Sequence, residues 1–435
     1  MHNILNIKIK FFISLLLAFS WSFFSILLSY KWFHDLSLIV GVYFSIYLIG
    51  FIAIVPGFIN SFQYFSLLFD QRPQFIKVDH FPDVTVLIAA YNEEKTIQKT
   101  ILSLQKQDYP SVIHIIVIDD GSKDATVNKI IELQKDCSYL HLSQMPSNQG
   151  KANALNQGLK EVTTSLVITI DADCLLLANS IKNIVSRYLS DPPNTKAVAG
   201  TILVSNSRDN WITKAQEWDY FIGIGAIKRI QSMYQGTLVA QGAFSIYDTN
   251  TLNQLGGWPN MVGEDIVLTW RMLNKGYRIG HAENACVFTV CPNTIYKFIK
   301  QRQRWSRGLI EAFKHNPQLI YKPRLSTIYI WLNFLFPFID LAYTVGFLPG
   351  MILALFGKFW IVGPMTLILI PQAILLNSLM YIRVKKMFLL QGLKIRKNIF
   401  GFLFYLLPYG LILQPACVYG YFSEFFGIKK TWGTK

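Results

Sequence analysis

The chain has 435 residues, of which 52% are hydrophobic and only 15% are charged, and this composition excludes a wholly soluble protein, in which about a quarter of the residues are charged. The formal net charge is +15, yet no basic stripe with interleaved aromatic residues appears outside the segment near residue 300. We therefore expect no nucleic acid partner, and we attribute the charge to an anionic membrane surface and a phosphate-bearing substrate.

Two uncharged apolar runs lie near the start of the chain, at residues 11–29 and 36–60. Each is long enough to cross a bilayer as a helix, which takes about 20 residues. A signal peptide is the alternative for the first run, but the run is too long and a second one follows at once. We expect residues 1–65 to form two transmembrane helices.

Residues 70–320 have an ordinary soluble composition, in which apolar runs alternate with segments of helical spacing. Strands are expected at 83–90, 112–120 and 165–173, and helices at 93–107 and 124–136. Strands that are apolar on both faces and alternate with helices indicate an α/β fold with a mostly parallel sheet. A dinucleotide-binding domain is excluded, since the first turn, "AAYNEEKT", has no glycine.

Polar residues follow the first two strands, where ligands of such sheets bind. Tyr91 and Glu93 follow the first strand, and Asp119 and Asp120 end the second. The simple interpretation of "DDGS" is a tight turn between a strand and a helix. The functional interpretation is that these residues contact the base and ribose of a nucleotide.

Two carboxylates, Asp171 and Asp173, close the apolar strand at 165–173. Most Asp-x-Asp pairs only cap loops, but an unpaired carboxylate at the end of a buried strand is unfavourable. Carboxylates together with phosphate oxygens are how proteins hold Mg²⁺ or Mn²⁺, so we favour a metal site.

The stretch "NQGKANAL" places Lys151 at the start of a predicted helix. A helix N-terminus with an adjacent lysine attracts phosphate. The Gly and Ser/Thr spacing of a P-loop is missing.

The acidic pair Glu264 and Asp265 opens another segment of helical spacing. Acids at a helix start are favoured by the unpaired backbone N–H groups, so ordinary capping explains the pair on local grounds.

Gln301, Arg304 and Trp305 are spaced i, i+3, i+4 in "IKQRQRWSRGLIEAF" and share one face of a helix. An arginine binds phosphate oxygens, and a tryptophan offers an apolar plate to a sugar ring. A basic amphipathic helix that lies on a membrane surface is the other interpretation, and both can hold at once, so we expect the 70–320 domain to end in an interfacial helix that carries Gln-x-x-Arg-Trp.

Apolar runs return at 326–356, 359–382 and 398–423, and we expect about three further transmembrane helices within 325–425, followed by a tail at 426–435. The segment 383–398 is rich in basic residues, whereas Lys358 is the only charge in the preceding loop. Basic loops stay in the cytoplasm. We expect a multi-pass protein of the plasma (inner) membrane with its middle domain in the cytoplasm.

The stretches "YNEE", "DDGS", "DAD", "GED" and "QRQRW" stand in one order along the chain. In this order and spacing the chain resembles the processive family 2 glycosyltransferases, which include cellulose, chitin, hyaluronan and poly-N-acetylglucosamine synthases. The likeness covers about 80–310, and the apolar flanks extend it. Gly263 and Arg307 depart from the residues usual at their positions.

The resemblance implies a nucleotide-sugar-binding domain of the GT-A type that polymerises a β-linked polysaccharide, such as poly-N-acetylglucosamine, from a UDP-sugar. It implies that Asp265 is the general base and that Asp173 and Asp171 hold Mg²⁺ or Mn²⁺. A growing glycan, membrane lipid and a small membrane accessory subunit are the implied partners. The donor would contact Tyr91, Glu93, Asp119, Asp120, Lys151, Asp171 and Arg304, and the acceptor would contact Gln301, Trp305 and Glu264.

Two other functions stay open from the sequence. A lipid glycosyltransferase that adds one sugar shares the Gln-x-x-Arg-Trp pattern. A transporter with a regulatory domain is favoured only by Asp340, which lies within a predicted span.

Overall fold

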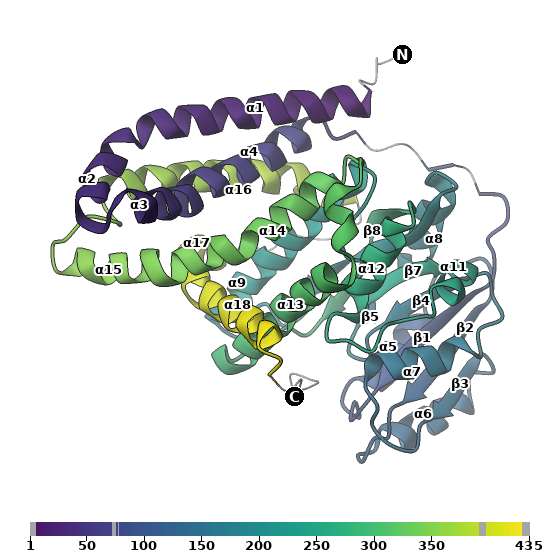
Figure 1. Cartoon of the computed structure of the whole chain (residues 1–435). Helices are drawn as coiled ribbons and strands as arrows, with labels where there is room; N and C mark the ends of the chain where they lie inside the picture. Colours follow the sequence, from purple (N-terminus) through teal and green to yellow (C-terminus); the bar gives the residue numbers. More distant parts are fainter. Residues whose placement is uncertain (1–5, 72–74, 77, 391–396, 429–435) are drawn as a thin grey trace.

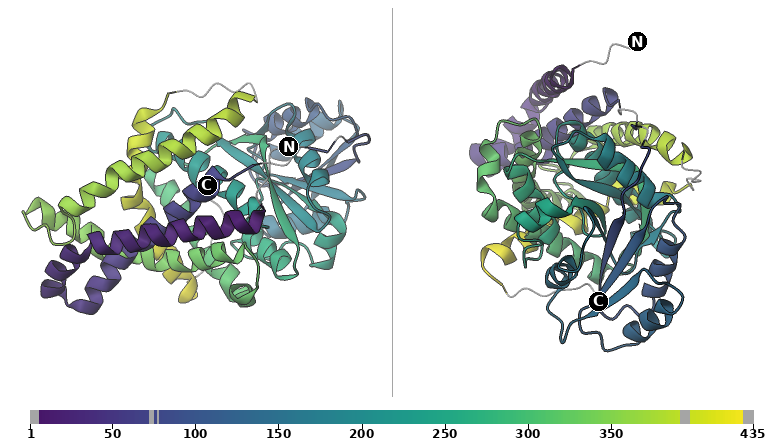
Figure 2. Two further views of the ribbon diagram at one scale, coloured as in Figure 1. Left: turned by 90° about the horizontal axis from the view of Figure 1, so that it is seen from above. Right: turned by 90° about the vertical axis from the view of Figure 1, so that its right-hand side faces the viewer.

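The computed structural model describes residues 6–71, 75–76, 78–390 and 397–428. A helix-covered sheet forms one part of the molecule, and a bundle of long apolar helices projects from it to one side (Figure 1 and Figure 2). The expected combination of an α/β domain with flanking apolar helices is confirmed.

Two apolar helical segments near the N-terminus lie against each other and run in opposite directions (Figure 1). Both are long and apolar enough to cross a membrane. The turn between the two segments lies at Gly41. The first segment therefore extends beyond residue 29, where the predicted span ends, and it includes residues 36–40, which are the start of the second predicted span. It continues because Trp32 and Leu36 are buried against neighbouring helices. The segments consist of α1 (Ile7–Leu28), α2 (Tyr30–Val40), α3 (Val42–Ile49), η1 (Gly50–Ile54) and α4 (Val55–Leu68).

Eight strands form one mixed sheet in the order β3-β2-β1-β4-β7-β6-β8-β5. The half made of β1 to β4 is parallel, as the alternating pattern predicts. β7 then inserts antiparallel to both β4 and β6. The strands are β1 (Val84–Ala90), β2 (Ile113–Asp119), β3 (Leu140–Gln144), β4 (Leu166–Ile170), β5 (Leu175–Leu176), β6 (Thr195–Val204), β7 (Phe244–Asp248) and β8 (Arg278–Thr289).

Helices cover both faces of this sheet, because successive strand residues point to opposite sides. Val86 and Ile88 pack with α5 (Ile97–Gln105), α6 (Thr126–Gln134) and α8 (Ser180–Ser190). Leu87 packs in the other core, with α7 (Lys151–Leu159) and α12 (Glu264–Asn274). The remaining helices of this part are α9 (Trp211–Trp218), η2 (Asp219–Ala226), α10 (Ile227–Met233), α11 (Thr249–Gln254), α13 (Ile295–His315) and η3 (Pro317–Tyr321).

The helices between residues 327 and 390 return alongside the N-terminal pair, whereas the last two helices lie against the sheet domain (Figure 1). Thr327–Leu355 is a third helical segment long and apolar enough to cross a membrane, and α17 with α18 would make a fourth if this pair, bent by 48°, counts as one span. The predicted span at 359–382 stays a prediction. Lys394 and Arg396 of the basic loop lie outside the described residues. The helices are α14 (Thr327–Ala342), η4 (Tyr343–Phe347), α15 (Leu348–Leu355), α16 (Pro364–Leu390), α17 (Ile399–Leu406) and α18 (Tyr409–Phe425).

Candidate active site

The carboxyl ends of β1, β2 and β4 meet at one edge of the sheet, because these strands are parallel and in register. Ala90 lies opposite Asp119, and Leu87 lies opposite Thr169. The polar residues that follow each strand are therefore neighbours. Tyr91 is 40% exposed at this edge, and its ring is open to a ligand.

The turn after β1 is fastened to the turn after β2. The Asn92 amide donates to Ser122 Oγ at 2.9 Å, and the Lys123 amide donates to Asn92 Oδ1 at 2.9 Å. The Glu93 amide donates to Thr126 Oγ1 at 2.8 Å, and the Thr96 hydroxyl donates to the Glu93 carboxylate at 2.7 Å. These bonds hold Glu93 in one place beside the strand ends.

Asp119 and Asp120 are both buried, but their contacts differ. Asp119 accepts a hydrogen bond from the Ser122 amide at 3.2 Å, within its own turn. Asp120 accepts from the amides of Gln149 and Gly150, at 2.7 and 2.9 Å. Asp120 therefore holds the loop that starts α7, and its predicted contact with the nucleotide stays a prediction.

Lys151, the first residue of α7, joins two of the acidic stretches. Its Nζ contacts Asp171 Oδ1 and lies 4.0 Å from Glu264 Oε1. Burial alone would lower the pKa of Lys151, but the carboxylates of Asp171, Glu264 and Asp265 outweigh burial and raise it. Lys151 is therefore a fixed positive charge between the end of β4 and the start of α12.

Asp265 lies in the first turn of α12 and makes one local and one distant contact. Its Oδ1 accepts from the neighbouring Ile266 amide at 2.7 Å, which is a contribution to the helix terminus. Its Oδ2 accepts from the Gly242 amide at 3.3 Å, across the loop that precedes β7. The capping interpretation is thus correct for one oxygen, while the second faces the strand ends.

Glu264 is more deeply buried than Asp265, with 6% exposure. Burial, reinforced by the charge of Asp265, raises the pKa of Glu264 to about 8, although Lys151 and Arg304 act in the opposite direction. The raised pKa favours the protonated form of Glu264, which can donate a hydrogen bond.

Helix α13 bears Gln301, Arg304 and Trp305 on one face, and Arg304 of this face lies near Glu264. Trp305 is 38% exposed, and its ring centroid lies 6.2 Å from that of Tyr220. Gln301 Nε2 lies 3.5 Å from the Tyr220 hydroxyl, and Gln301 Oε1 is buried with no partner among the described residues. Arg304 is half-buried and close enough to Glu264 to influence its ionisation.

A close glycine contact sets the distance between α12 and α13. A Cβ built on Gly263 would lie 2.5 Å from Gly308 Cα, so neither position has room for a side chain. The Gly263 amide also donates to the buried Glu311 carboxylate at 2.8 Å. Close packing of α12 against α13 thus explains why glycine replaces the residue that is usual at position 263.

The other unusual residue, Arg307, attaches α13 to the last described helix. Arg307 Nη2 lies 3.3 Å from Glu424 Oε2 and donates to the Ile428 carbonyl at 2.7 Å. Lys314 adds a second cation, 3.2 Å from Glu424 Oε1. A Cβ on Gly420 would lie 2.5 Å from the Gln303 carbonyl, so α18 runs directly against α13.

Arg302 belongs to the site, although the sequence analysis did not select it. Its guanidinium lies 4.2 Å from the Trp305 ring centroid and forms a 2.7 Å ion pair with Asp219. Asp219 also accepts from the Tyr409 hydroxyl at 2.9 Å. The only sequence signal was its position inside "QRQRW", because the i, i+3, i+4 pattern passes over it.

Lys228 of α10 is a second residue without a sequence signal. It is 7% exposed, and its Nζ donates to the Val239 carbonyl at 2.8 Å, on the segment that leads to Gly242. Burial lowers the pKa of Lys228 to about 7, and the Asp265 carboxylate only partly offsets this effect.

Asp171 and Asp173 are the candidate metal ligands. Asp171 is half-exposed, and Asp173 accepts from the Thr289 hydroxyl at 3.3 Å. No group of three His, Cys, Asp or Glu side chains suited to a metal occurs in the described part of the chain. Mg²⁺ typically takes one or two carboxylates and completes its shell with phosphate oxygens and water. The pair therefore fits an ion that is shared with a diphosphate.

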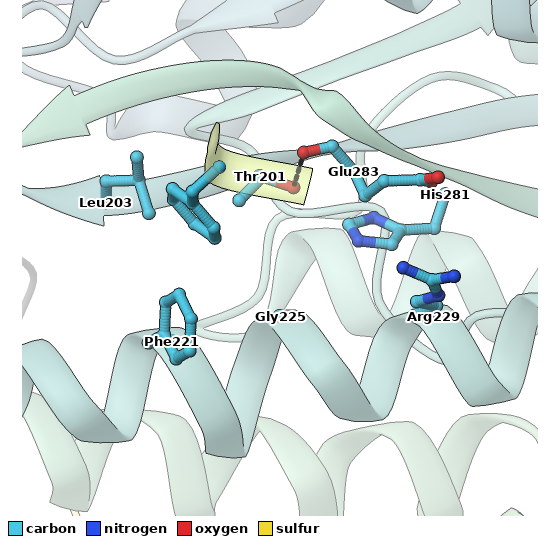
Figure 3. A pocket seen from close by; sticks show the side chains of 8 residues that line it. Thr201, Leu203, Phe221, Gly225, Arg229, His281 and Glu283 are labelled. Carbon is cyan, nitrogen blue, oxygen red and sulfur yellow. Dashed lines mark hydrogen bonds between the residues drawn. The ribbon is translucent and has the colours of Figure 1, made fainter. Parts of the chain in front are cut away.

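A separate, very small cavity of about 10 Å³ lies between β6, β8 and the η2–α10 segment (Figure 3). Thr201 and Glu283 line it on the sheet side, and Phe221 and Arg229 line it on the helix side. Phe221 also packs against Phe388 of α16, at 4.8 Å between ring centroids. None of the predicted site residues lines this cavity. The cavity lies between α16 and the sheet domain.

A sheet with acids at its strand ends and an adjoining basic-aromatic helix defines a GT-A-like transferase fold. Residues 85–256 match the family model "Glycosyl transferase family 2". Residues 85–256 are thus similar to the family 2 glycosyltransferases.

Similar proteins carry a more specific name. The chain is 32% identical over 287 residues to poly-beta-1,6-N-acetyl-D-glucosamine synthase of Staphylococcus aureus, covering 66% of this chain and 65% of that protein. It is 31% identical over 248 residues to the synthase of the same name from Staphylococcus epidermidis, covering 57% and 59%. The matches thus span less than two thirds of these relatives.

The fold has a counterpart among solved structures. A mannosyltransferase from Pyrobaculum calidifontis, solved with GDP-Man and Mn²⁺, aligns with a TM-score of 0.59 at 18% identity, over 88% of this chain and 99% of that one. This likeness concerns the fold alone.

Proposed function

We propose that the protein is an inverting membrane glycosyltransferase that polymerises a β-linked polysaccharide, poly-N-acetylglucosamine, from UDP-N-acetylglucosamine. The match of residues 85–256 to the family 2 model and the names of the staphylococcal relatives support this proposal. The observation that carries it is the convergence of Asp171, Lys151, Glu264 and Asp265 at the carboxyl ends of the strands.

The donor would lie along the strand ends. Tyr91 would face the base, and Glu93 and Asp119 would accept hydrogen bonds from base or ribose groups. Asp120 would act mainly by holding the loop before Lys151. Lys151 and Arg304 would attract the diphosphate, because charge-assisted hydrogen bonds to phosphate are the strong ones. Asp171 is shared between this group and the metal ligands.

Asp265 would be the general base. Its carboxylate would take the proton of the acceptor hydroxyl while the hydroxyl oxygen forms a bond to the anomeric carbon. The bond from that carbon to the diphosphate oxygen breaks in line, and UDP leaves with the electron pair. In-line displacement converts an α-linked donor into a β-linked product. The hydrogen bond from the Gly242 amide would keep Asp265 aimed at the acceptor.

Asp173 and Asp171 would hold the divalent ion, Mg²⁺ or Mn²⁺. When bound, the ion would neutralise charge on the departing diphosphate.

The acceptor would lie on α13. Trp305 is exposed enough to stack against a sugar ring, and the unpartnered Gln301 oxygen can accept from a sugar hydroxyl. Glu264, whose raised pKa favours the protonated form, can donate a hydrogen bond to a sugar oxygen.

The apolar helices indicate a membrane protein. We propose that residues 1–65 and 325–425 lie in the plasma membrane, with 70–320 in the cytoplasm and 426–435 as a tail. Surrounding lipid and a small accessory membrane subunit would be the remaining partners.

The first experiment uses the full-length protein with Asp265→Asn. We expect transfer from radiolabelled UDP-N-acetylglucosamine to stop, while UDP still binds in calorimetry, because the amide keeps the shape of the side chain but cannot take a proton. Full activity of the variant would refute the role of Asp265. A wild-type product consisting only of organic-soluble monoglycosyl lipid would refute polymerisation.

The second experiment tests the metal ligands by calorimetry of UDP binding with and without Mg²⁺. We expect Mg²⁺ to tighten UDP binding to the wild type and to have much less effect on Asp173→Ala. An equal gain in both proteins would exclude Asp173 as a ligand.

A further inference from the structure

A basic groove lies where α9 meets α17. The groove is open to solvent, has a volume of about 340 Å³, and is lined by Arg208, Lys214, Lys397, Asn398, Ile399 and Phe400. None of these residues has a part in sugar transfer as proposed above.

The groove is a built feature, because side chains fix its two walls against each other. Asn398 Nδ2 donates to the Lys214 carbonyl at 2.9 Å, and its Oδ1 accepts from the Gly401 amide at 3.0 Å. Trp218 Nε1 donates to the Asn398 carbonyl at 2.9 Å. Ring contacts of 4.7 Å between Trp218 and Phe402, and of 5.2 Å between Trp211 and Phe404, press α17 onto α9.

The charge of the groove is only partly balanced. Arg208 forms a 2.8 Å ion pair with Glu217. Lys214 and Lys397 form no ion pair with a carboxylate among the residues that the structure describes. Two ammonium groups therefore remain for an anion, and lysine is a common point-charge ligand of phosphate.

The surroundings of the groove favour a lipid as the source of this anion. Ile399 and Phe400 are 68% and 70% exposed, and they are the first two residues of the bent pair of apolar helices α17 and α18. Tryptophan, as at Trp211 and Trp218, is enriched where membrane meets water. A soluble phosphate compound would gain nothing from the exposed apolar side chains.

We propose that this groove binds the headgroup of an anionic phospholipid, with Lys214 and Lys397 on the phosphate and with Ile399 and Phe400 against the acyl chains. The proposal is independent of sugar transfer. A lipid bound here would hold α9 and α17 at the depth of the headgroups.

The test is native mass spectrometry of the purified full-length protein, titrated in mild detergent with phosphatidylglycerol or phosphatidylcholine. We expect wild type to prefer phosphatidylglycerol, and Lys214→Gln and Lys397→Gln each to weaken its binding about fivefold, since one cation near an anionic surface contributes about that factor. The matched control is Lys106→Gln, an exposed lysine at the end of α5, which should bind as wild type does. Phe400→Ser keeps both lysines, so it should weaken lipid binding only through the lost contact between Phe400 and the acyl chains.

Three results would overturn the proposal. The first is unchanged phosphatidylglycerol binding in the double lysine variant, provided that it unfolds at the wild-type temperature. The second is equal binding of both lipids by wild type. The third is displacement of the lipid by soluble glycerol phosphate at equal concentration, which would assign the groove to a free phosphate compound. If the lysine variants do not fold, unaltered binding in Phe400→Ser counts against the lipid.

Discussion

The contact between Gly263 and Gly308 makes the alignment of the two halves of the candidate site sensitive to one methyl group. Gly263 precedes the acidic pair on α12, and Gly308 lies one turn beyond Trp305 on α13. In Gly263→Ala the added Cβ would lie 2.5 Å from Gly308 Cα, whereas ordinary contact begins at 3.4 Å. The helices must separate by about 0.9 Å, since backbone atoms cannot rotate away as a flexible side chain can.

Two consequences of different size follow from this displacement. Overpacking typically destabilises a protein by about 1–3 kcal/mol, so we expect a lower unfolding temperature. A displacement of about 1 Å between reacting groups can reduce the rate by about 10²-fold. We therefore expect the rate per folded molecule to fall by one to two orders of magnitude, because Asp265 moves relative to Arg304 and Trp305.

The assay measures sugar transfer and thermal unfolding on the same full-length preparation, so that activity is expressed per folded protein. Gly50→Ala is the matched control, because a Cβ at Gly50 meets nothing within 4 Å. It should leave both quantities unchanged. A Gly263→Ala protein with wild-type rate and unfolding temperature would refute the argument that this contact aligns the site.

Two further predictions concern ionisation and stacking. Folding raises the pKa of Glu264 from 4.5 to about 8, so the free energy of unfolding of the wild type should fall by at most about 5 kcal/mol as the pH rises through this window. Glu264→Gln cannot ionise, so its unfolding temperature should exceed that of the wild type by more at pH 9 than at pH 5. An equal difference at both pH values would contradict the raised pKa. Arg302→Lys keeps a cation for Asp219 but loses the planar guanidinium that stacks on Trp305. We therefore expect up to a tenfold higher KM for an acceptor oligosaccharide, with kcat little changed. A fall in kcat alone would contradict a positioning role for Arg302.

Local patterns were sufficient to predict the parallel half of the sheet and the edge where its acids gather. Parallel strands bring their carboxyl ends together, so Glu93, Asp119 and Asp171 become neighbours without any knowledge of tertiary packing. The shared face of Gln301, Arg304 and Trp305 follows in the same way from helix geometry.

Contacts between distant segments could not be predicted in this way. Arg302 looks like an ordinary surface charge until Asp219 and Tyr409 are placed beside it. Lys228 is buried only because the segment before β7 folds over it. The antiparallel insertion of β7 has no local signature either, since a strand in either direction has the same pattern.

The link between α13 and α18 joins two parts of the chain that are synthesised at different times. Arg307 meets Glu424 across 117 positions of the chain, and the ribosome makes Glu424 long after the sheet domain has left the exit tunnel. A nascent chain can thus fold its sheet domain before α18 anchors α13. Under the proposed function, sugar transfer would begin only once α18 is in place against α13.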